Sequence, residues 1–211
     1  MIPSREEIRA SLEERHGKEM QEKLEAAEVA ICGLGGLGSA IAIALSRAGV
    51  GKLHLIDFDR VDLSNINRQQ YSLNEIGMAK TDAMEKEIRR YSPYCNVRKT
   101  FVKLTEENVQ EVLKSDKIIC EAFDRAEEKA MLTNAVLEKL PGSVLVGASG
   151  MAGCGSSNEI VTRKVMKNYY ICGDGISEIS EGNGLMAPRV MICAAHQANM
   201  VIRIISGKEE A

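Results

Sequence analysis

The stretch Gly33-Leu34-Gly35-Gly36-Leu37-Gly38 decides how this chain of 211 residues folds. It follows an apolar run, Val29-Ala30-Ile31-Cys32, and precedes a segment with helical periodicity. Glycines spaced as Gly-x-Gly-x-x-Gly let the backbone turn tightly from a strand into a helix and approach a phosphate. The free N–H groups at the helix N-terminus attract that phosphate. The spacing therefore predicts a nucleotide-binding loop.

Short β-branched runs alternate with helical segments outward from this loop. The alternation predicts an α/β fold: a Rossmann-like, mostly parallel sheet with flanking helices, extended by a β-rich C-terminal portion and a final helix. We expect strands over 29–32, 53–56, 96–102, 117–121 and 144–146, and helices over about 37–48, 79–91, 105–114, 125–139 and 190–205. A single domain would comprise a helical arm (1–27), a nucleotide-binding core (28–150) and a C-terminal portion (151–211).

The composition argues against several classes of partner. The net charge is -3 and aromatic residues make up 4% of the chain, so it has neither the basic field nor the stacking surface that nucleic acid needs. Apolar runs stay well below the roughly 20 residues of a membrane span, and the start lacks an apolar export segment, so we expect a cytoplasmic protein with no membrane partner. Six cysteines without a Cys-x-x-Cys pair favour buried, reduced thiols.

Two acidic residues follow the second predicted strand. Asp57 stands where the acid of a Rossmann fold bonds the ribose hydroxyls of a nucleotide. Asp59 is the alternative for this contact, or it caps the turn that follows the strand. We expect Asp57 to make the ribose contact.

The loop Ser64-Asn65-Ile66-Asn67-Arg68 lies beyond the carboxyl ends of the predicted strands, where open α/β sheets bind ligands. The rigid guanidinium of Arg68 suits phosphate oxygens, and the amide of Asn65 can donate to them. Lys80, near the start of the next helix, supplies a second cation. Taken singly, such cations are most often solvated surface charges, so their meaning depends on their neighbours.

A further carboxylate, Asp124, follows the fourth predicted strand at the same edge of the sheet. It suits Mg²⁺, which binds one or two carboxylates together with phosphate oxygens. The alternative is that Asp124 caps the helix beginning near Arg125, and Glu121 is a second candidate acid.

In this order, the glycine loop, Asp57-Phe58-Asp59, the Asn65 to Arg68 loop, Lys80 and Asp124 resemble the ThiF/MoeB/HesA family, bacterial relatives of the ubiquitin-activating enzymes. The resemblance covers about residues 15–150 well, and it is nearest to the short second family of ThiF proteins of thiamine biosynthesis.

The resemblance implies an enzyme that uses ATP and Mg²⁺ to adenylylate the C-terminal glycine carboxylate of a ubiquitin-like sulfur carrier protein, with release of pyrophosphate. For thiamine thiazole synthesis the carrier would be ThiS-like, with a separate sulfur donor protein. The family also implies a homodimer, and it places the carrier's tail against the glycine-rich stretch at 171–184 and the final helix.

The resemblance also assigns roles by motif. The nucleotide would be held by Gly33, Gly35, Gly36, Gly38 and Asp57, and its phosphates by Asn65 and Arg68. Lys80 would neutralise charge on the leaving group, and Asp124 would bind magnesium. The catalytic residues would then be Arg68, Lys80 and Asp124.

The chain departs from the family pattern in three places. Where the family reads Arg-Tyr-x-Arg-Gln, whose second arginine reaches the partner subunit's site, this chain has Arg15-His16-Gly17-Lys18, which leaves Arg15 or Lys18 as candidates. The two zinc-binding Cys-x-x-Cys pairs are missing, so we expect no zinc. Around the magnesium acid, Glu121-Ala122-Phe123-Asp124-Arg125 replaces the usual Cys-Thr-Asp-Asn.

Cys172 lies where the family has its first zinc pair. Its glycine-rich setting predicts exposure; we interpret it as an inert thiol, with a covalent link to the carrier as the alternative.

Three other functions fit parts of the pattern. One is a ThiF-like adenylyltransferase that acts on another carboxylate, on tRNA or on a peptide. Another is an NAD-dependent oxidoreductase, which leaves Asn65, Arg68, Lys80 and Asp124 without a joint purpose. The third is a scaffold that binds a carrier without turnover.

Overall fold

The computed structural model describes residues 2–208 and 210–211. Its centre is a seven-stranded sheet in the order β3-β2-β1-β4-β5-β7-β6. The strands are β1 (Glu28–Cys32), β2 (Lys52–Asp57), β3 (Asn96–Phe101), β4 (Ile118–Glu121), β5 (Val144–Ala148), β6 (Val161–Met166) and β7 (Tyr169–Gly173). All neighbours pair in parallel except β6, which runs antiparallel to β7 at one edge. The predicted α/β class with a mostly parallel sheet is confirmed.

The strand order places a topological switch between β1 and β4. At such a point the connections leave neighbouring strands in opposite directions and open a crevice at the carboxyl ends, where ligands bind. The glycine loop follows β1, Asp57 ends β2, and Asp124 follows β4. The topology therefore brings these three features to one edge of the sheet.

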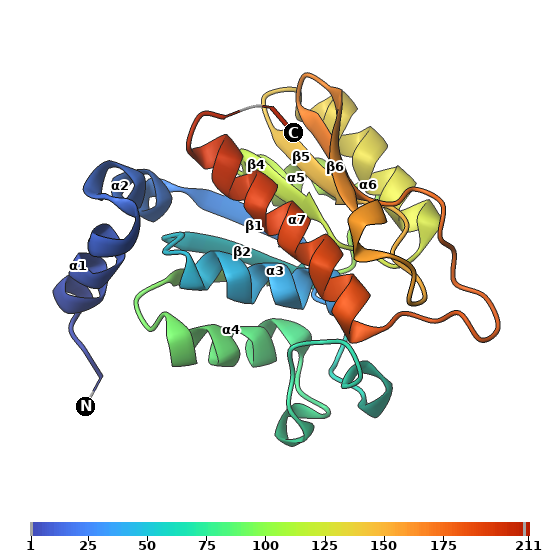
Figure 1. Cartoon of the computed structure of the whole chain (residues 1–211), viewed down its shortest axis with the longest axis horizontal. Coiled ribbons are helices and arrows are strands. Elements are labelled where there is room, and N and C mark those ends of the chain that lie inside the picture. Colours follow the sequence, from blue (N-terminus) through green and yellow to red (C-terminus); the bar gives the residue numbers. More distant parts are fainter. Residues whose placement is uncertain (1, 209) are drawn as a thin grey trace.

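Helices cover both faces of the sheet (Figure 1). On one face α3 (Gly36–Arg47) packs between α4 (Lys80–Tyr91) and α7 (Ala187–Ile205), and α5 (Val109–Leu113) and α6 (Ala126–Lys139) cover the other. Successive strand residues point to opposite faces, so Ile31 of β1 joins the buried cluster under α3 and α7, whereas Ala30 and Cys32 join the cluster under α5 and α6.

The N-terminal arm consists of α1 (Arg5–His16) and α2 (Lys18–Ala26), separated by Gly17 at a φ of 89°. Arg9 of α1 pairs with Glu25 of α2 at 2.8 Å, which holds the two helices together. In Figure 1 the arm lies at the side of the molecule away from the long connection between β7 and α7.

Three predicted elements differ in extent by two or more residues at one end, and one of these is the final helix, which was expected from residue 190 and begins at Ala187. The helix expected over 105–114 is reduced to α5, because the side chain of Asn108 accepts from the Thr105 amide at 2.8 Å and donates to the Lys103 carbonyl at 2.9 Å. These bonds hold the segment before α5 in a turn. β5 runs further than expected, through Ala148, because its last residues pair with β7. Within the described residues, none of the helices combines the length and the apolar character needed to cross a bilayer.

Candidate functional site

A cavity of about 790 Å³ opens at the carboxyl ends of the strands. Its walls come from the glycine loop, the β2–α4 connection (residues 58–79), the segments after β3, β4 and β5, and the crossover segment (residues 174–186) that joins β7 to α7. The residues predicted from the sequence that line it are Gly33, Gly35, Gly36, Asp57, Asn65, Arg68, Lys80 and Asp124. The fold thus gathers into one cavity side chains that lie far apart in the sequence.

The glycine loop has the tight backbone that its spacing predicts. Gly33 has a φ of +93°, and a Cβ there would lie 2.9 Å from the Ala122 carbonyl oxygen. The helix α3 begins at Gly36, so the free N–H groups of its first turn adjoin the cavity. Gly38 is not among the described residues that line the cavity. A Cβ on it would collide with the Gly33 carbonyl, so this glycine serves the packing of helix against loop.

Asp57 and Tyr71 clamp the glycine loop. The Asp57 carboxylate accepts from the Leu34 amide through Oδ2 at 2.6 Å and from the Asp59 amide through Oδ1 at 2.7 Å. The Tyr71 hydroxyl donates to the Leu34 carbonyl at 2.9 Å. Burial, followed by the nearby Asp57 charge, raises the pKa of Tyr71 well above its usual value, so it stays a neutral donor. The loop is therefore held in shape by the protein, and each Asp57 oxygen keeps a lone pair for a ribose hydroxyl.

Besides Asp59, the β2–α4 connection carries three polar residues to the cavity. Asn65 ends a 3-10 helix (Leu63–Asn65), and its side-chain oxygen accepts from the Asp62 amide at 3.1 Å. Arg68 donates from Nη1 to the Ser64 carbonyl at 3.1 Å, but its Nε is buried without a partner. The buried side-chain oxygen of Gln69 also has no partner. Unpaired buried polar atoms beside a cavity are expected where a polar ligand completes their hydrogen bonds.

Gln69 was not predicted from the sequence. It is 7% exposed and lines the cavity beside the glycine loop, with its Nε2 atom 3.9 Å from the place of a Cβ on Gly35. Its position directly after Arg68 was the available signal, because the same turn presents both side chains.

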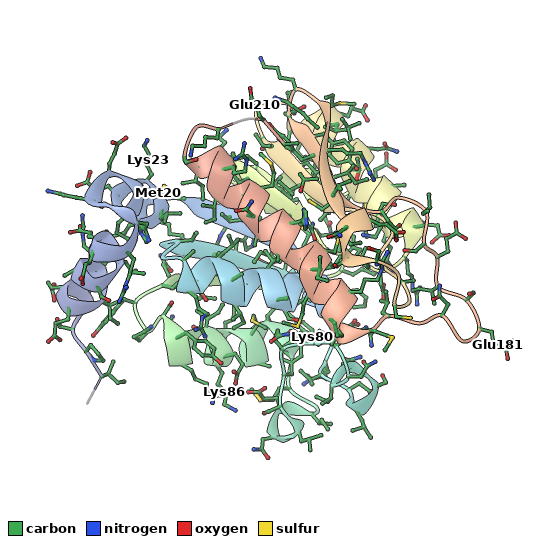
Figure 2. All side chains as sticks on the ribbon, viewed as in Figure 1. Met20, Lys23, Lys80, Lys86, Glu181 and Glu210 are labelled. Atoms are coloured by element: carbon green, nitrogen blue, oxygen red, sulfur yellow. The ribbon has the colours of Figure 1, made fainter. Side chains whose placement is uncertain are left out.

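Lys80 and Asp59 form an ion pair on the cavity wall. Nζ of Lys80 lies 2.9 Å from Oδ2 of Asp59, and the Lys80 amide donates to the Asp59 carbonyl at 2.9 Å. Lys80 is almost fully buried and begins α4, where Figure 2 labels it beside the β2–α4 connection. Asp59 thus orients the cation, while Asp57 is the acid beside the glycine loop. The two acids of the Asp57-Phe58-Asp59 motif have separate tasks.

Asp124 has an exposed side chain on the cavity wall. The N-cap position of α6 belongs to Arg125, so the capping alternative for Asp124 is wrong. An exposed carboxylate in a cavity that also holds phosphate-type donors fits the way Mg²⁺ is bound, by one or two carboxylates and substrate phosphates.

Glu121, the second candidate acid, has a structural role. It is buried at the end of β4, where Oε1 accepts from the Phe123 amide at 2.7 Å and lies 2.9 Å from Nζ of Lys129. It therefore supports the turn that carries Asp124, and its carboxylate is not free for a metal ion.

The rest of the cavity wall consists of residues that belong to none of the sequence motifs. Lys103, after β3, lies over the Phe58 ring at 5.4 Å and pairs with Glu128 of α6 at 3.1 Å. The apolar residues of the wall include Val102, Leu104, Met151, Ala152, Ile179, Leu185 and Val190. In sequence these positions are indistinguishable from core residues, because only the folded chain shows that they border a cavity.

The expectation that Cys172 is exposed was wrong. Its side chain is 0% exposed in β7, and burial raises the pKa of its thiol to about 11. The neighbouring Thr162 hydroxyl lies 3.5 Å from its sulfur. Gly173 and Gly175 follow Cys172, but pairing with β5 and β6 and the packing of α7 cover its side chain. All six cysteines are free, and Cys154 is the exposed one.

Arg15 and Lys18 do not reach this cavity within the chain. Arg15 lies in the last turn of α1, and Lys18 begins α2, where it pairs with Glu22 at 3.9 Å. Both side chains are exposed on the arm. In the part of the chain that the structure describes, no three His, Cys, Asp or Glu side chains are grouped to hold a metal ion.

Together these features define a class of protein: an open, mostly parallel α/β sheet with a phosphate-type glycine loop and a cation-lined cavity at its switch point. The model of the ThiF family matches residues 9–211, and the chain belongs to the ThiF family.

Two curated relatives illustrate the family. The chain is 37% identical to a molybdopterin-synthase adenylyltransferase of Haemophilus influenzae over 113 residues, which are 53% of this chain and 46% of that protein. It is 29% identical to a sulfur carrier protein ThiS adenylyltransferase of Bacillus subtilis over 212 residues, covering 98% of this chain and 61% of that protein. The chain therefore spans about half the length of these relatives.

A solved structure shares the fold over its whole length. The tRNA N6-threonylcarbamoyladenosine dehydratase of E. coli, in complex with ATP, matches with a TM-score of 0.87 at 22% identity, covering 99% of this chain and 98% of that chain. At this identity the likeness shows the fold alone.

Proposed function

We propose that this protein adenylylates the C-terminal carboxylate of a ubiquitin-like sulfur carrier protein, a ThiS-like partner in thiamine thiazole synthesis. The observation that carries the proposal is the meeting of a glycine loop, Arg68, Lys80 and Asp124 in one cavity of about 790 Å³. Family membership supports an adenylyltransferase, and a named relative acts on ThiS.

The geometry supports a proposed role in this reaction for each of these groups. The amides at the start of α3 and the guanidinium of Arg68 would hold phosphate oxygens, and Asp57 the ribose. Lys80, kept at the wall by Asp59, would neutralise charge on the departing pyrophosphate. Asp124 would hold Mg²⁺, which supplies charge neutralisation between the phosphates. The attacking carboxylate is ionised at neutral pH, so the step needs positioning and charge stabilisation but no general base.

The crossover segment favours a polypeptide substrate. It contains three acidic residues, Asp174, Glu178 and Glu181, and no lysine or arginine. Ile176 and Ile179 are exposed there, at 82% and 59%. Of these acids Glu178 lines the cavity, and its negative charge repels the phosphodiester backbone of tRNA but not the uncharged backbone of an extended peptide.

A second candidate is an adenylyltransferase that acts on a carboxylate of tRNA. The observation in its favour is the shared fold with the E. coli tRNA N6-threonylcarbamoyladenosine dehydratase over 98% of that chain. The two candidates use the same ATP chemistry and differ in what brings the carboxylate, so the acceptor decides between them.

Exchange of radiolabelled pyrophosphate into ATP tests the proposal. With a ubiquitin-like carrier ending in Gly-Gly and Mg²⁺, exchange should depend on the carrier, and Arg68→Ala and Asp124→Ala should lower it by about 100-fold or more. Arg47→Ala is the matched control, because Arg47 lies at the far end of α3 over the Tyr91 ring. Exchange that depends on tRNA bearing N6-threonylcarbamoyladenosine would favour the second candidate, and carrier binding without exchange would favour a scaffold.

A further inference from the structure

The crossover segment (residues 174–186) borders the cavity at both of its ends. Ser177, Glu178 and Ile179 line the cavity near its start, and Leu185 lines it near its end. Between them the segment extends away from the sheet, and Figure 2 shows Glu181 at its outer tip. Its first part has to be held firmly if it is to act as a wall.

Asp174 holds the start of the segment. Oδ1 of its carboxylate accepts from the amides of both Ile176 and Ser177 at 2.8 Å, and its own amide donates to the Gly150 carbonyl at 3.0 Å. The Ser177 hydroxyl in turn accepts from the Ala152 amide at 3.1 Å. The segment is thus tied to the cavity wall that follows β5. Gly150 must be glycine here, because a Cβ would collide with the Asp174 carboxylate.

Arg189 connects this anchor to α7. Its Nη2 donates to Oδ2 of Asp174 at 2.6 Å, and its Nη1 donates to the Ser156 carbonyl at 2.7 Å. The side chains of Arg189 and Asp174 are 4% and 3% exposed, so water solvates and screens their charges only weakly. The next residue, Val190, lies on the cavity wall against Gly36. One guanidinium therefore joins the crossover segment, the segment after β5 and the first turn of α7.

The ion pair keeps its charge over the working range of pH. Burial alone would raise the pKa of Asp174, but hydrogen bonds from the Ser177 and Ile176 amides and from Arg189 outweigh it and hold the pKa well below its usual range. An arginine stays protonated throughout. A buried ion pair is costly to desolvate and adds little net stability, so its presence favours a role in setting geometry.

The wall that this pair sets is unsuited to the nucleotide. Glu178 brings a negative charge to the cavity, whereas Arg68 and Lys80, the cations for phosphate, come from the β2–α4 connection and the start of α4. Beside it, exposed Ile179 offers apolar contact, and the half-buried Ser177 lines the cavity with a hydroxyl that can donate a hydrogen bond. This wall therefore suits the polypeptide that delivers the carboxylate.

We propose that Asp174 and Arg189 are a positioning pair that holds residues 176–179 in place to bind the tail of the carboxylate-bearing polypeptide. The inference rests on the proposed function. Neither residue is among the described residues that line the cavity, so neither is placed to contact the nucleotide or the reacting atoms. Loss of the pair should therefore weaken binding of the polypeptide and leave ATP binding unchanged.

Steady-state exchange kinetics test the pair, with a ubiquitin-like carrier ending in Gly-Gly as the probe. Arg189→Gln should raise KM for the carrier by about tenfold or more and change KM for ATP by less than about twofold. In Arg189→Lys, KM for the carrier should lie between the values of the unchanged protein and of Arg189→Gln. An ammonium keeps the charge but bonds only one of the two acceptors well. Hydrogen exchange at the Ile176 and Ser177 amides should accelerate in Arg189→Gln, since their acceptor is released.

Glu159→Gln is the matched control. Glu159 is the outer neighbour of Arg189, at 3.4 Å from Nη2, and its side chain is 57% exposed, so both KM values should stay as in the unchanged protein. Ser177→Ala serves if Arg189→Gln fails to fold: it removes one tie between segment and wall, and should raise KM for the carrier alone.

An unchanged KM for the carrier in folded Arg189→Gln or Ser177→Ala would overturn the inference, as would an equal rise in KM for ATP. Absence of carrier-dependent exchange in the unchanged protein is a different result, because it refutes the proposed function itself.

Discussion

Nζ of Lys129 lies 2.9 Å from Oε1 and 3.1 Å from Oε2 of Glu121, so that a buried carboxylate and a lysine of α6 are joined by two hydrogen bonds. The same carboxylate accepts from the Phe123 amide at 2.7 Å and, at 3.4 Å, from the Ala148 amide. It thereby links β4, the start of α6 and the end of β5. The departure Glu121-Ala122-Phe123-Asp124 from the family pattern thus has its own internal support.

We expect the two members of this pair to be strongly coupled. Lys129→Met leaves a buried carboxylate without its cation and should lower the free energy of unfolding by about 3 kcal/mol or more. Glu121→Gln should cost about 1 to 3 kcal/mol, because Lys129, whose side chain is 20% exposed, can turn to water. Urea denaturation of both variants and of the double variant checks this. Additive losses in the double variant would contradict a direct pair.

Lys80 is predicted to act on the phosphates, and its neighbourhood offers a sharp comparison. Lys80→Met should lower pyrophosphate exchange by about 100-fold, because it removes the buried cation of the cavity wall. Lys99→Met is the control: Lys99 binds Asp82 and Glu85 of the same helix α4 at 2.7 and 2.8 Å, on the surface. Equal rates in the two variants would refute a phosphate role for Lys80.

Asp59→Asn should give a smaller loss than Lys80→Met. The asparagine keeps the backbone bond between residues 59 and 80 but removes the charge that orients the lysine. We expect a decrease of about tenfold in exchange, with kcat more affected than KM for ATP.

Gly36 lines the cavity at a position of the glycine loop that has little room for a side chain. A Cβ there would lie 2.9 Å from Cγ1 of Val190 and 3.4 Å from Cγ of Arg68. Gly36→Ala should therefore displace α7 or Arg68 and raise KM for ATP by about tenfold, measured in the exchange assay. Gly142→Ala, where the nearest atom is Lys117 Nζ at 3.8 Å, should leave KM unchanged.

Thiol labelling distinguishes the cysteines. With a pKa raised by burial to about 11, the Cys172 thiol at pH 8 is about one-thousandth thiolate and is also shielded from reagent. The native protein should react with an alkylating reagent at Cys154, and Cys154→Ser should abolish this labelling while Cys172→Ser leaves it unchanged. Mass spectrometry of the labelled peptides shows which thiol reacted. A covalent carrier adduct on Cys172 would contradict the burial.

Protonation of Asp174 should remove its contribution to the stability of the fold only in strong acid. Its pKa is lower in the folded chain than in the unfolded one, so the stability it contributes is fully present above about pH 4 and is lost as the pH falls through the folded value. Asp174→Asn should therefore be less stable than the unchanged protein at pH 7, and the difference should shrink below pH 4. A difference independent of pH would contradict an ionised Asp174.

Local patterns were enough to predict most of the fold. The Gly-x-Gly-x-x-Gly spacing and the alternation of apolar runs depend on neighbouring residues, and the parallel strands then send the glycine loop, Asp57, Arg68 and Asp124 to one edge. Chain order also predicted the family to which the chain belongs. The prediction failed where a side chain hydrogen-bonds the nearby backbone in place of the helix, as at Asn108, whose bonds shorten α5.

Only the tertiary structure decided which of these groups are buried, paired or open. It joins Asp59 to Lys80, exposes Asp124, buries Cys172 under α7 and brings Gln69 to the cavity. It also links Asp174 to Arg189 across the crossover segment. Burial and ion pairing depend on contacts between residues distant in sequence, whereas periodicity and spacing reflect the backbone geometry of neighbours. The sequence alone thus determined the architecture and the candidate residues, and packing determined what each of them is free to do.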